Sequence, residues 1–303
     1  MKRDRIDTFA ATSLIAFSAL LGLNQVMIKV VNAGLQPVFQ AGLRSLIALP
    51  FVVAWCLWRG KKMGFGEGTF WPGILCGMLF GGEFILLFLA LDYTTVSRTA
   101  IFFYTMPFWL AIAAHFLIPG ERLTTVRVCG LVLAFAGVVL ALSEDSATLG
   151  PDALLGDFLC LIAAMMWGGI ALVARTTALS KSTPEMQLIY QLLVSAPMIL
   201  FASLFFGDFV RELEWYHLAI LGTQSVVVVA FGFAFWFWIL SVYPASDMAS
   251  FGFLAPVFGV FFAWAILGDE VGPVLIVSLV MVGAGIVLVN RKPKQAVVEN
   301  AAE

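Results

Sequence analysis

The sequence predicts an all-α integral membrane protein of ten transmembrane helices, built as two inverted five-helix repeats. Three observations lead to this fold class: an apolar composition, ten apolar runs of membrane-spanning length, and a pattern of residues that recurs in both halves. Of the 303 residues, 61% are hydrophobic and 12% are charged. A soluble domain is about half apolar and a quarter charged. Most of the chain is therefore expected to lie in a lipid bilayer.

The ten runs are found by cutting the chain at polar residues, Gly and Pro, since a helix needs about 20 apolar residues to cross a bilayer. They extend over residues 8–31, 37–58, 70–91, 97–118, 124–143, 154–178, 184–207, 215–241, 245–267 and 272–290. The first run is longer than a signal-peptide core and lacks a convincing cleavage site, so it is expected to remain as a helix. No soluble domain fits between the spans.

Basic residues in the short loops predict the orientation of the chain. Thirteen of the 17 Lys and Arg residues fall on the side of the N-terminus: Lys2, Arg3, Arg5, Arg59, Lys61, Lys62, Arg122, Arg127, Arg175, Lys181, Arg291, Lys292 and Lys294. The opposite side carries acidic loops at 144–152 and 208–214, with Arg211 as its clear cation. Both termini, including a tail over 293–303, are predicted to be cytoplasmic in a bacterial inner membrane.

The two halves of the chain share a pattern of Pro, Gly, Gln and charged residues. Pairs at a shift of 147 residues are Pro37 and Pro184, Gln40 and Gln187, and Pro50 and Pro197. Pairs at 146 or 149 are Gly22 and Gly168, Lys29 and Arg175, Pro107 and Pro256, and Glu121 and Glu270. The near-constant shift predicts duplication of a five-helix unit, as repeats over 1–147 and 148–292. Because five is odd, the second repeat must run in the opposite direction. Inverted repeats are typical of secondary transporters and favour alternating access.

With these features the chain resembles the EamA type of the drug/metabolite transporter superfamily. The resemblance rests on the ten spans, the duplication, the segment GLNQVMIK at 22–29, Trp167-Gly168, and the endings LIPGE at 117–121 and ILGDE at 266–270. It covers nearly the whole chain. One departure is Leu21-Gly22, where the family commonly has Trp-Gly, so an aromatic substrate contact is not expected at that position.

Within the family, the length, the many aromatic residues and the charged intramembrane residues are similar to those of YddG-like aromatic amino-acid exporters. The resemblance implies a basket of ten helices around a central cavity, with the fifth and tenth spans outermost. It also implies a carrier that exports a small amphiphilic metabolite, in first place an aromatic or neutral amino acid, by alternating access. Another metabolite or drug, import, proton coupling or facilitated diffusion, and the oligomeric state stay open.

Other function classes find little support in the sequence. The chain lacks a P-loop, so ATP hydrolysis is not the expected energy source. His115 and His217 are far apart and no nucleophile motif is present, so no enzyme is expected; a channel is disfavoured by the inverted repeats. The four cysteines show no metal-binding spacing and are predicted to be buried thiols, with no metal or cofactor. Balanced charge excludes a basic nucleic-acid surface, which leaves a small-molecule substrate and lipid as the expected partners.

The isolated carboxylate of Glu83 is the main candidate for a functional group. A charged group at the centre of a span is costly, so it normally faces a cavity or a partner. Arg44 lies at a matching depth, since it is about 10 Å and Glu83 about 12 Å from the outer ends of their spans at 1.5 Å per residue. The two either neutralise each other in the packed repeat or border the cavity, where Arg44 would attract a carboxylate and Glu83 an ammonium or a proton. A lipid-facing Glu83 is the third alternative. The repeat equivalent of Arg44 is the uncharged Gln191.

Aromatic and amide side chains supply further candidate substrate contacts. Large rings gather at the expected cavity depth: Phe102, Phe103, Tyr104, Trp167, Tyr190, Trp236 and Trp238. Most aromatic residues in such positions pack against lipid or helices, and Tyr104, Trp167 and Tyr190 are selected because their polar ring atoms tolerate water. Asn24 and Gln25 add hydrogen-bonding groups in the first span.

Gating residues are expected at the ends and bends of the spans. Lys29 and Arg175 occupy equivalent helix ends on opposite sides, where they either reach toward the headgroups or close a gate. Arg98 and Asp247 form a second equivalent pair, each able to cap a helix or latch a gate. Pro107 and Pro256 interrupt helical hydrogen bonding in the fourth and ninth spans, so each predicts a kink that can act as a hinge.

Overall fold

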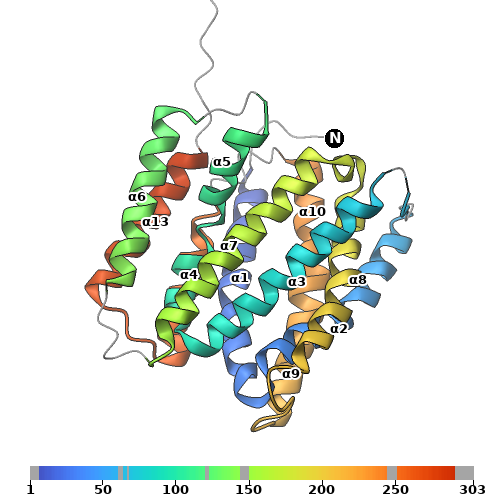
Figure 1. The fold of residues 1–303 in the computed structure, drawn as a ribbon, viewed down its shortest axis with the longest axis horizontal. Coiled ribbons are helices and arrows are strands. Elements are labelled where there is room, and N and C mark those ends of the chain that lie inside the picture. The colour runs from blue at the N-terminus through green and yellow to red at the C-terminus, as the bar shows by residue number, and fades with distance from the viewer. Residues whose placement is uncertain are drawn as a thin grey trace, which may run out of the picture.

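The computed structural model describes residues 7–60, 64–66, 68–119, 123–143, 150–243 and 251–290. Within them the chain is helical (Figure 1), without strands apart from one isolated bridge between Leu35 and Val210. The α-helices are α1 (Thr8–Gly34), α2 (Pro37–Trp58), α3 (Phe70–Tyr93), α4 (Val96–Phe103), α5 (Met106–Leu117), α6 (Thr125–Leu142), α7 (Ala153–Thr176), α8 (Pro184–Ser203), α9 (Trp215–Thr223), α10 (Phe233–Val242), α12 (Leu254–Phe262) and α13 (Pro273–Asn290). The described residues also form the 3-10 helix η2 (Ala178–Lys181) and the π-helices η3 (Gln224–Gly232) and η5 (Ala263–Leu267).

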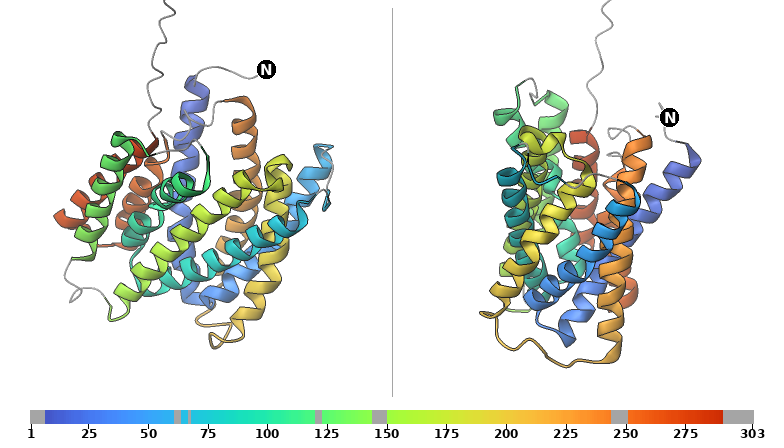
Figure 2. Two further views of the ribbon diagram at one scale, coloured as in Figure 1. Left: turned by 45° about the horizontal axis from the view of Figure 1, so that its top comes forward. Right: turned by 90° about the vertical axis from the view of Figure 1, so that its right-hand side faces the viewer.

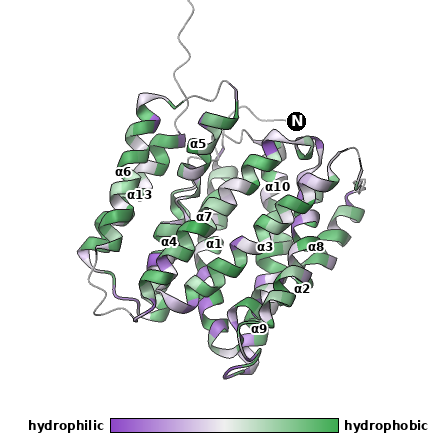
Figure 3. Ribbon diagram, viewed as in Figure 1, coloured by the Kyte–Doolittle hydropathy of each residue, from purple (hydrophilic) through white to green (hydrophobic). Residues whose placement is uncertain are grey.

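These elements correspond to the ten predicted spans. Among the described residues, nine helical stretches are long and apolar enough to cross a membrane, and Leu254–Leu267 is a shorter apolar helix at the predicted ninth span. The fourth span consists of α4 and α5, and the eighth of α9, η3 and α10. Most of the helical ribbon is apolar in the view of Figure 3, as expected of a protein whose solvent is lipid. The fold class is confirmed.

Helix starts show why equivalent segments of the two halves adopt the same local structure. The side chain of Gln36 accepts a hydrogen bond from the backbone N–H of Phe39, and Pro37 then opens α2. In the second half, Thr183 accepts from the N–H of Met186 and Pro184 opens α8. The caps satisfy N–H groups that have no helical acceptor, and proline is favoured in the first helical turn because its missing N–H is not needed there.

Helix contacts in the bundle recur when each helix is replaced by its equivalent in the other repeat. Two contacts join a helix to its own repeat equivalent: α2 with α8, and α6 with α13. The contact of α1 with α12 recurs as that of α7 with α5, and α3 with α8 recurs as α2 with η3. The helices α6 and α13 lie side by side at one end of the bundle (Figure 1), and a second view agrees (Figure 2). This pairing agrees with a pseudo-two-fold relation between the repeats.

The fourth span breaks at a proline, as the sequence predicts. The helix α4 ends at Phe103, and α5 begins at Met106 with Pro107 in its first turn. The hydroxyl of Thr105 donates to the carbonyl of Phe102 at 2.6 Å, which satisfies one acceptor at the break. Proline lacks an N–H and its ring clashes with the preceding turn, so the helix cannot continue through this point. In the second half, Pro256 again lies in the first turn of its helix, α12.

The cysteines differ from the prediction at one position. Cys56, Cys76 and Cys160 are buried, but Cys129 is exposed on α6. The apolar run around Cys129 faces outward, because α6 packs against the bundle chiefly through Gly130, Ala134 and Gly137. An apolar neighbourhood in a membrane span therefore does not distinguish a buried thiol from a lipid-facing one. No group of three or more potential metal ligands occurs in the part of the chain that the structure describes.

Candidate functional site

A cavity of about 540 Å³ lies in the middle of the bundle and reaches its N-terminal side. Its inner end is lined by Gln25, Arg44, Glu83 and Leu87. Toward the N-terminal side the lining continues to the last turn of α7 at Arg175 and the last residue of α13, Asn290. Binding pockets for small molecules commonly measure about 300 to 1,000 Å³. The cavity is therefore large enough for a metabolite of amino-acid size.

Arg44 and Glu83 both line the inner end without pairing with each other. Their side chains are 2% and 3% exposed. Within the described residues no ion pair joins them within 4.0 Å, and neither Arg44 Nε nor Glu83 Oε2 has a hydrogen-bond partner. Removing the partner of a buried charge costs about 3 to 5 kcal/mol, so two unpaired charges in one cavity are expensive. A ligand carrying both charges would compensate them.

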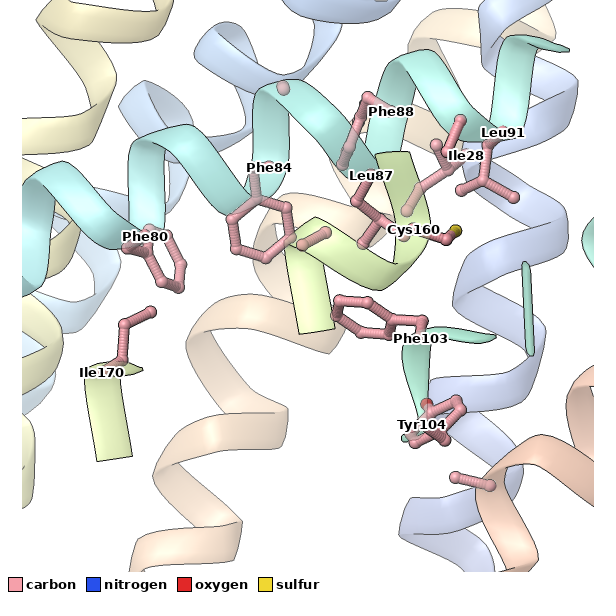
Figure 4. Close-up of a cluster of buried hydrophobic side chains, with 14 of the residues drawn as sticks. Ile28, Phe80, Phe84, Leu87, Phe88, Leu91, Phe103, Tyr104, Cys160 and Ile170 are labelled. Carbon is pink, nitrogen blue, oxygen red and sulfur yellow. The ribbon is translucent and has the colours of Figure 1, made fainter. Parts of the chain in front are cut away.

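Aromatic rings hold the guanidinium of Arg44 in place. Its Cζ atom lies 4.1 Å from the centre of the Phe84 ring and 4.8 Å from that of Phe88. Both rings belong to α3, one turn and two turns from Phe80, and stack edge to face along the helix (Figure 4). A desolvated cation over a ring gains about 2 kcal/mol or more. The rings thus support the cation while its N–H groups stay available.

The amide of Gln25 is the second polar feature of the cavity. Gln25 is 3% exposed, and neither its Nε2 nor its Oε1 has a partner among the described residues. Asn24, next in the lining, has an unpartnered Oδ1. Buried polar atoms are normally hydrogen-bonded, and a group left without a partner calls for a functional explanation. Both predicted amides therefore have unused hydrogen-bonding atoms at the cavity.

Two predicted aromatic residues form one wall of the cavity. Trp167 stacks on Phe103 with centroids 4.9 Å apart at 15°, and meets Tyr104 edge to face at 6.0 Å. Phe103 and Tyr104 lie at the break between α4 and α5, below the rings of α3 (Figure 4). Phe102, its neighbour, is fully buried in the core instead. The broken helix thus turns two successive rings toward the cavity.

Other aromatic candidates take different positions. Tyr190 is 2% exposed and does not line the cavity. Its hydroxyl lies 3.1 Å from that of Thr69, and its ring fills the space where a side chain at Gly73 would stand. Trp236 lines the cavity and stacks on Phe17 at 5.0 Å, whereas Trp238 packs against Phe9 and Phe235. Tyr190 therefore has a packing role between α3 and α8.

Several lining residues were not among the sequence candidates. They come from every part of the chain and include Phe80, Phe84, Leu110, Arg127, Gln187, Val228, Val229 and Phe233. Gln187 carries a signal in the sequence, because it is the repeat equivalent of Gln40. The others are apolar or lie at a basic helix start, so no pattern separates them from lipid-facing residues. Val228 and Val229 belong to the π-helix η3, and π-turns are frequent at functional sites.

On the side opposite the N-terminus, Lys29 ties α1 to the turn between α3 and α4. Its Nζ donates to the backbone carbonyls of Asp92 at 3.2 Å and Thr94 at 3.0 Å. Its equivalent Arg175 lies exposed on the N-terminal side, at the rim of the cavity. Equivalent residues thus have different surroundings on the closed and the accessible sides.

Arg211 makes a second set of contacts between helices on the same side as Lys29. Its guanidinium donates to both carboxylate oxygens of Asp92, at 2.8 and 2.9 Å, and to the carbonyl of Asn32 at 3.0 Å. The hydrogen bonds with Asp92 are the main cause that raises the pKa of Arg211 above its ordinary value. The connection between α8 and α9 is thereby joined to α1 and α3.

Arg98 forms a buried ion pair that joins three helices. Its guanidinium donates to Asp157 of α7 at 3.1 and 3.2 Å through Nε, and to the carbonyl of Ala141 of α6 at 2.8 Å. Thr94 donates to the same carboxylate at 3.0 Å. Arg98 is 1% exposed and Asp157 fully buried, so this pair lies in the core and not at the cavity. Its predicted equivalent, Asp247, lies outside the described residues.

Two equivalent helix crossings differ in closeness. A Cβ atom on Gly22 of α1 would stand 2.6 Å from the backbone N of Gly259 and 2.9 Å from Cβ of Phe258, both on α12. On Gly168 of α7, the corresponding distances are 3.3 Å to N of Leu110 and 3.6 Å to Cβ of Trp109, on α5. Leu110 and Trp109 are the repeat equivalents of Gly259 and Phe258 at the shift of 149 residues. The two halves therefore use the same crossing in two different conformations.

Comparisons with known proteins agree with this architecture. The sequence model of the EamA-like transporter family matches the chain twice, at residues 8–143 and 154–291. The uncharacterized transporter YoaV of Bacillus subtilis is 25% identical over 90% of this chain and 94% of its own. A probable amino-acid metabolite efflux pump of Salmonella typhimurium is 29% identical over 88% of this chain and 89% of its own. A solved crystal structure shares the fold with a TM-score of 0.66 at 18% identity, covering 93% of this chain and 96% of that one.

Proposed function

Because the chain belongs to the EamA-like transporter family, we propose that it exports aromatic or other neutral amino acids from the cytoplasm by alternating access. The observation that carries this proposal is the cavity itself, in which an unpaired Arg44 and an unpaired Glu83 lie beside aromatic rings. The transporter class follows from the family, and one relative is named a probable amino-acid metabolite efflux pump. Substrate and direction are our proposal.

The chemistry of the site favours a zwitterion with an apolar side chain. In our assignment, Arg44 binds the substrate carboxylate and Glu83 the ammonium group, so each buried charge gains a partner. Charge-assisted hydrogen bonds contribute about 1.5 to 3 kcal/mol each. Tyr104 and Trp167 offer ring faces for the substrate side chain, while Asn24 and Gln25 supply uncharged donors and acceptors.

The proposed orientation in the membrane rests on the distribution of charge. The N-terminal side, which the cavity reaches, carries the basic loop residues Arg59 and Lys181, and basic loops are typical of the cytoplasmic side. We therefore propose cytoplasmic termini in a bacterial inner membrane, repeats over 1–147 and 148–292, a C-terminal tail over 293–303, and a cavity accessible from the cytoplasm. Lys29 and Arg211 then form the outer closure. Pro107 and Pro256 are proposed hinges, and Arg175 the inner counterpart of Lys29.

The different closeness of the two equivalent crossings supports alternating access. If the halves exchange conformations, the Gly168 crossing tightens while the Gly22 crossing loosens, and the cavity changes sides. Inverted repeats give the two states similar energies, because each repeat takes the conformation of the other. The energy source in this proposal is the gradient of the substrate, with proton exchange at Glu83 as the second candidate.

Counterflow in proteoliposomes tests the proposed function. Purified protein is reconstituted in vesicles loaded with unlabelled phenylalanine, and uptake of external radiolabelled phenylalanine is followed with and without an imposed pH gradient. Exchange that competing aromatic amino acids inhibit is the expected result, and protein-free vesicles give the background. Exchange at background level for all neutral amino acids would overturn the substrate assignment. Dependence on the pH gradient, abolished in Glu83→Gln, would select proton coupling.

A further inference from the structure

The face of α2 that continues outward from Arg44 carries buried amides. Gln40 lies one helical turn from Arg44 and is fully buried. Opposite it stands Gln224, also fully buried, at the first residue of the π-helix η3. Both lie beyond the inner end of the cavity and line none of it. The region between the cavity and the closed side therefore contains polar side chains that the cavity does not reach in the present conformation.

These amides are poorly satisfied in the present conformation. A single contact of 3.5 Å, from Gln40 Nε2 to Gln224 Oε1, joins the two side chains. Gln40 Oε1 and Gln224 Nε2 have no partner among the described residues. Leaving buried polar atoms unpaired costs free energy, and an apolar pair of the same shape would avoid that cost. The amides are therefore explained best by a second conformation in which water or a ligand reaches them.

The equivalence of α2 and α8 in the two repeats indicates what the second conformation is. Gln187 and Gln191 on α8 line the cavity on its accessible side. At the shift of 147 residues they are the equivalents of Gln40 and Arg44 on α2, and both helices start with a polar cap followed by Pro. The helices α2 and α8 also pack directly on each other, as self-equivalent elements do. An exchange of the two halves thus turns the α2 face into a cavity wall.

Closure of this face depends on Gln36, one turn further out. Its Nε2 donates to the carbonyls of Ser203 at 2.9 Å and Gly207 at 2.8 Å, and its backbone N–H to the carbonyl of Phe209 at 3.0 Å. These bonds hold the connection between α8 and α9 over the outer end of α2. Unlike Gln40, Gln36 is satisfied in the present conformation, as expected of a residue that stabilises the closed state.

From these observations we infer that Gln40 and Gln224 line the outer half of the transport path, as a binding site for the polar end of the substrate and for water in the opposite state. This inference rests on the proposed alternating access. In this inference the substrate is released along the path between α2 and η3, while Gln187 and Gln191 contact it on the side from which it is taken up. Arg44 lies where the uptake half and the release half of this path meet.

Cysteine accessibility tests this assignment from both sides of the membrane. Gln40→Cys and Gln187→Cys are introduced in a Cys129→Ser background, since the other native cysteines are buried. A membrane-impermeant maleimide is then added to right-side-out and to inside-out vesicles. Val38→Cys is the matched control, because Val38 is fully buried on the same helix and its equivalent, Glu185, does not line the cavity.

We expect Gln40→Cys and Gln187→Cys to react from opposite sides, each at least tenfold faster than Val38→Cys, and phenylalanine to slow both reactions. Reaction of Gln40→Cys no faster than Val38→Cys, or from the same side as Gln187→Cys, overturns the inference. Phenylalanine counterflow in the Cys129→Ser protein is measured separately. A carrier active in counterflow with an unreactive Gln40→Cys would leave the proposed function standing and remove only this path.

A second variant covers the case in which Gln40→Cys does not fold. The double substitution Gln40→Leu with Gln224→Leu removes both amides together and keeps the side-chain volume similar. We expect an unchanged or higher Tm in detergent, together with phenylalanine counterflow reduced at least tenfold. Counterflow within twofold of the parent protein overturns the inference, because a path residue cannot be replaced by Leu without cost to transport.

Discussion

Removing one charge at a time from the cavity separates a binding role of Arg44 and Glu83 from a packing role. The variants are Arg44→Gln and Glu83→Gln, which keep most of the side-chain volume and remove the charge. The two residues are 2% and 3% exposed, so solvent screens their interactions little. Each lost charge-assisted hydrogen bond costs about 1.5 to 3 kcal/mol. At 1.4 kcal/mol per factor of ten, phenylalanine affinity should fall about 10- to 150-fold in each variant.

The assay is inhibition of labelled phenylalanine binding or counterflow by three ligands: phenylalanine, phenethylamine and hydrocinnamate. Phenethylamine lacks the carboxylate, so Arg44→Gln should leave its affinity within about threefold, and hydrocinnamate should be equally insensitive to Glu83→Gln. The affinity for phenylalanine should be lowered by both substitutions. The matched control is Glu185→Gln, a carboxylate in the first turn of α8 that does not line the cavity.

Thermal stability supplies the result that would refute this reasoning. If Arg44 and Glu83 existed to neutralise each other, each single variant would strand a buried charge at a cost of about 3 to 5 kcal/mol, and the double variant would recover part of it. We expect an unchanged or higher Tm instead, because the two charges form no ion pair to begin with and each is costly where it lies. Large losses of Tm in both single variants, with unchanged affinity for all three ligands, would reduce the residues to packing.

Three further predictions follow from the helix contacts. Gly22→Ala should lower the Tm and phenylalanine counterflow far more than Gly168→Ala, because its Cβ would stand 2.6 Å from a backbone nitrogen against 3.3 Å for Gly168; equal losses in detergent melting would contradict the difference between the crossings. Arg98→Met should cost about 3 to 5 kcal/mol of stability by stranding Asp157, and adding Asp157→Leu should restore part of the Tm if the buried pair is the cause. Arg211→Ala should cost at most about 1 kcal/mol, since the pair with Asp92 is partly exposed, yet should raise maleimide labelling of Gln40→Cys. Because the pKa of Arg211 is raised above its ordinary value, its contribution is fully present below the unfolded pKa and is lost only as the pH rises through the folded pKa, so labelling of Gln40→Cys should not change between pH 5 and 9 through this group; a pH-dependent rise in that window that Arg211→Ala abolishes would contradict it.

The aromatic candidates differ most between what the sequence predicts and where the structure places them. Tyr104, Trp167 and Tyr190 have the same amphipathic character, which predicts a cavity position for each, but Tyr190 alone of the three packs outside the cavity. Its ring occupies the space left by Gly73 on α3, a contact between segments more than 100 residues apart. Helical position gives the depth of a side chain in the membrane and not the direction in which it points relative to neighbouring helices.

Sequence by itself determined the membrane class, the ten spans and the duplication, because these depend on local hydropathy and on residue spacing, which every segment carries on its own. It also determined that Arg44 and Glu83 lie at matching depth. Tertiary structure decided that they share a cavity without pairing, and that Arg98 finds Asp157 in the core. It alone decided which equivalent crossing is tight, since two repeats of one design can hold two conformations. Those outcomes depend on how ten apolar helices pack in space, and apolar sequences contain little information about which of their faces meet.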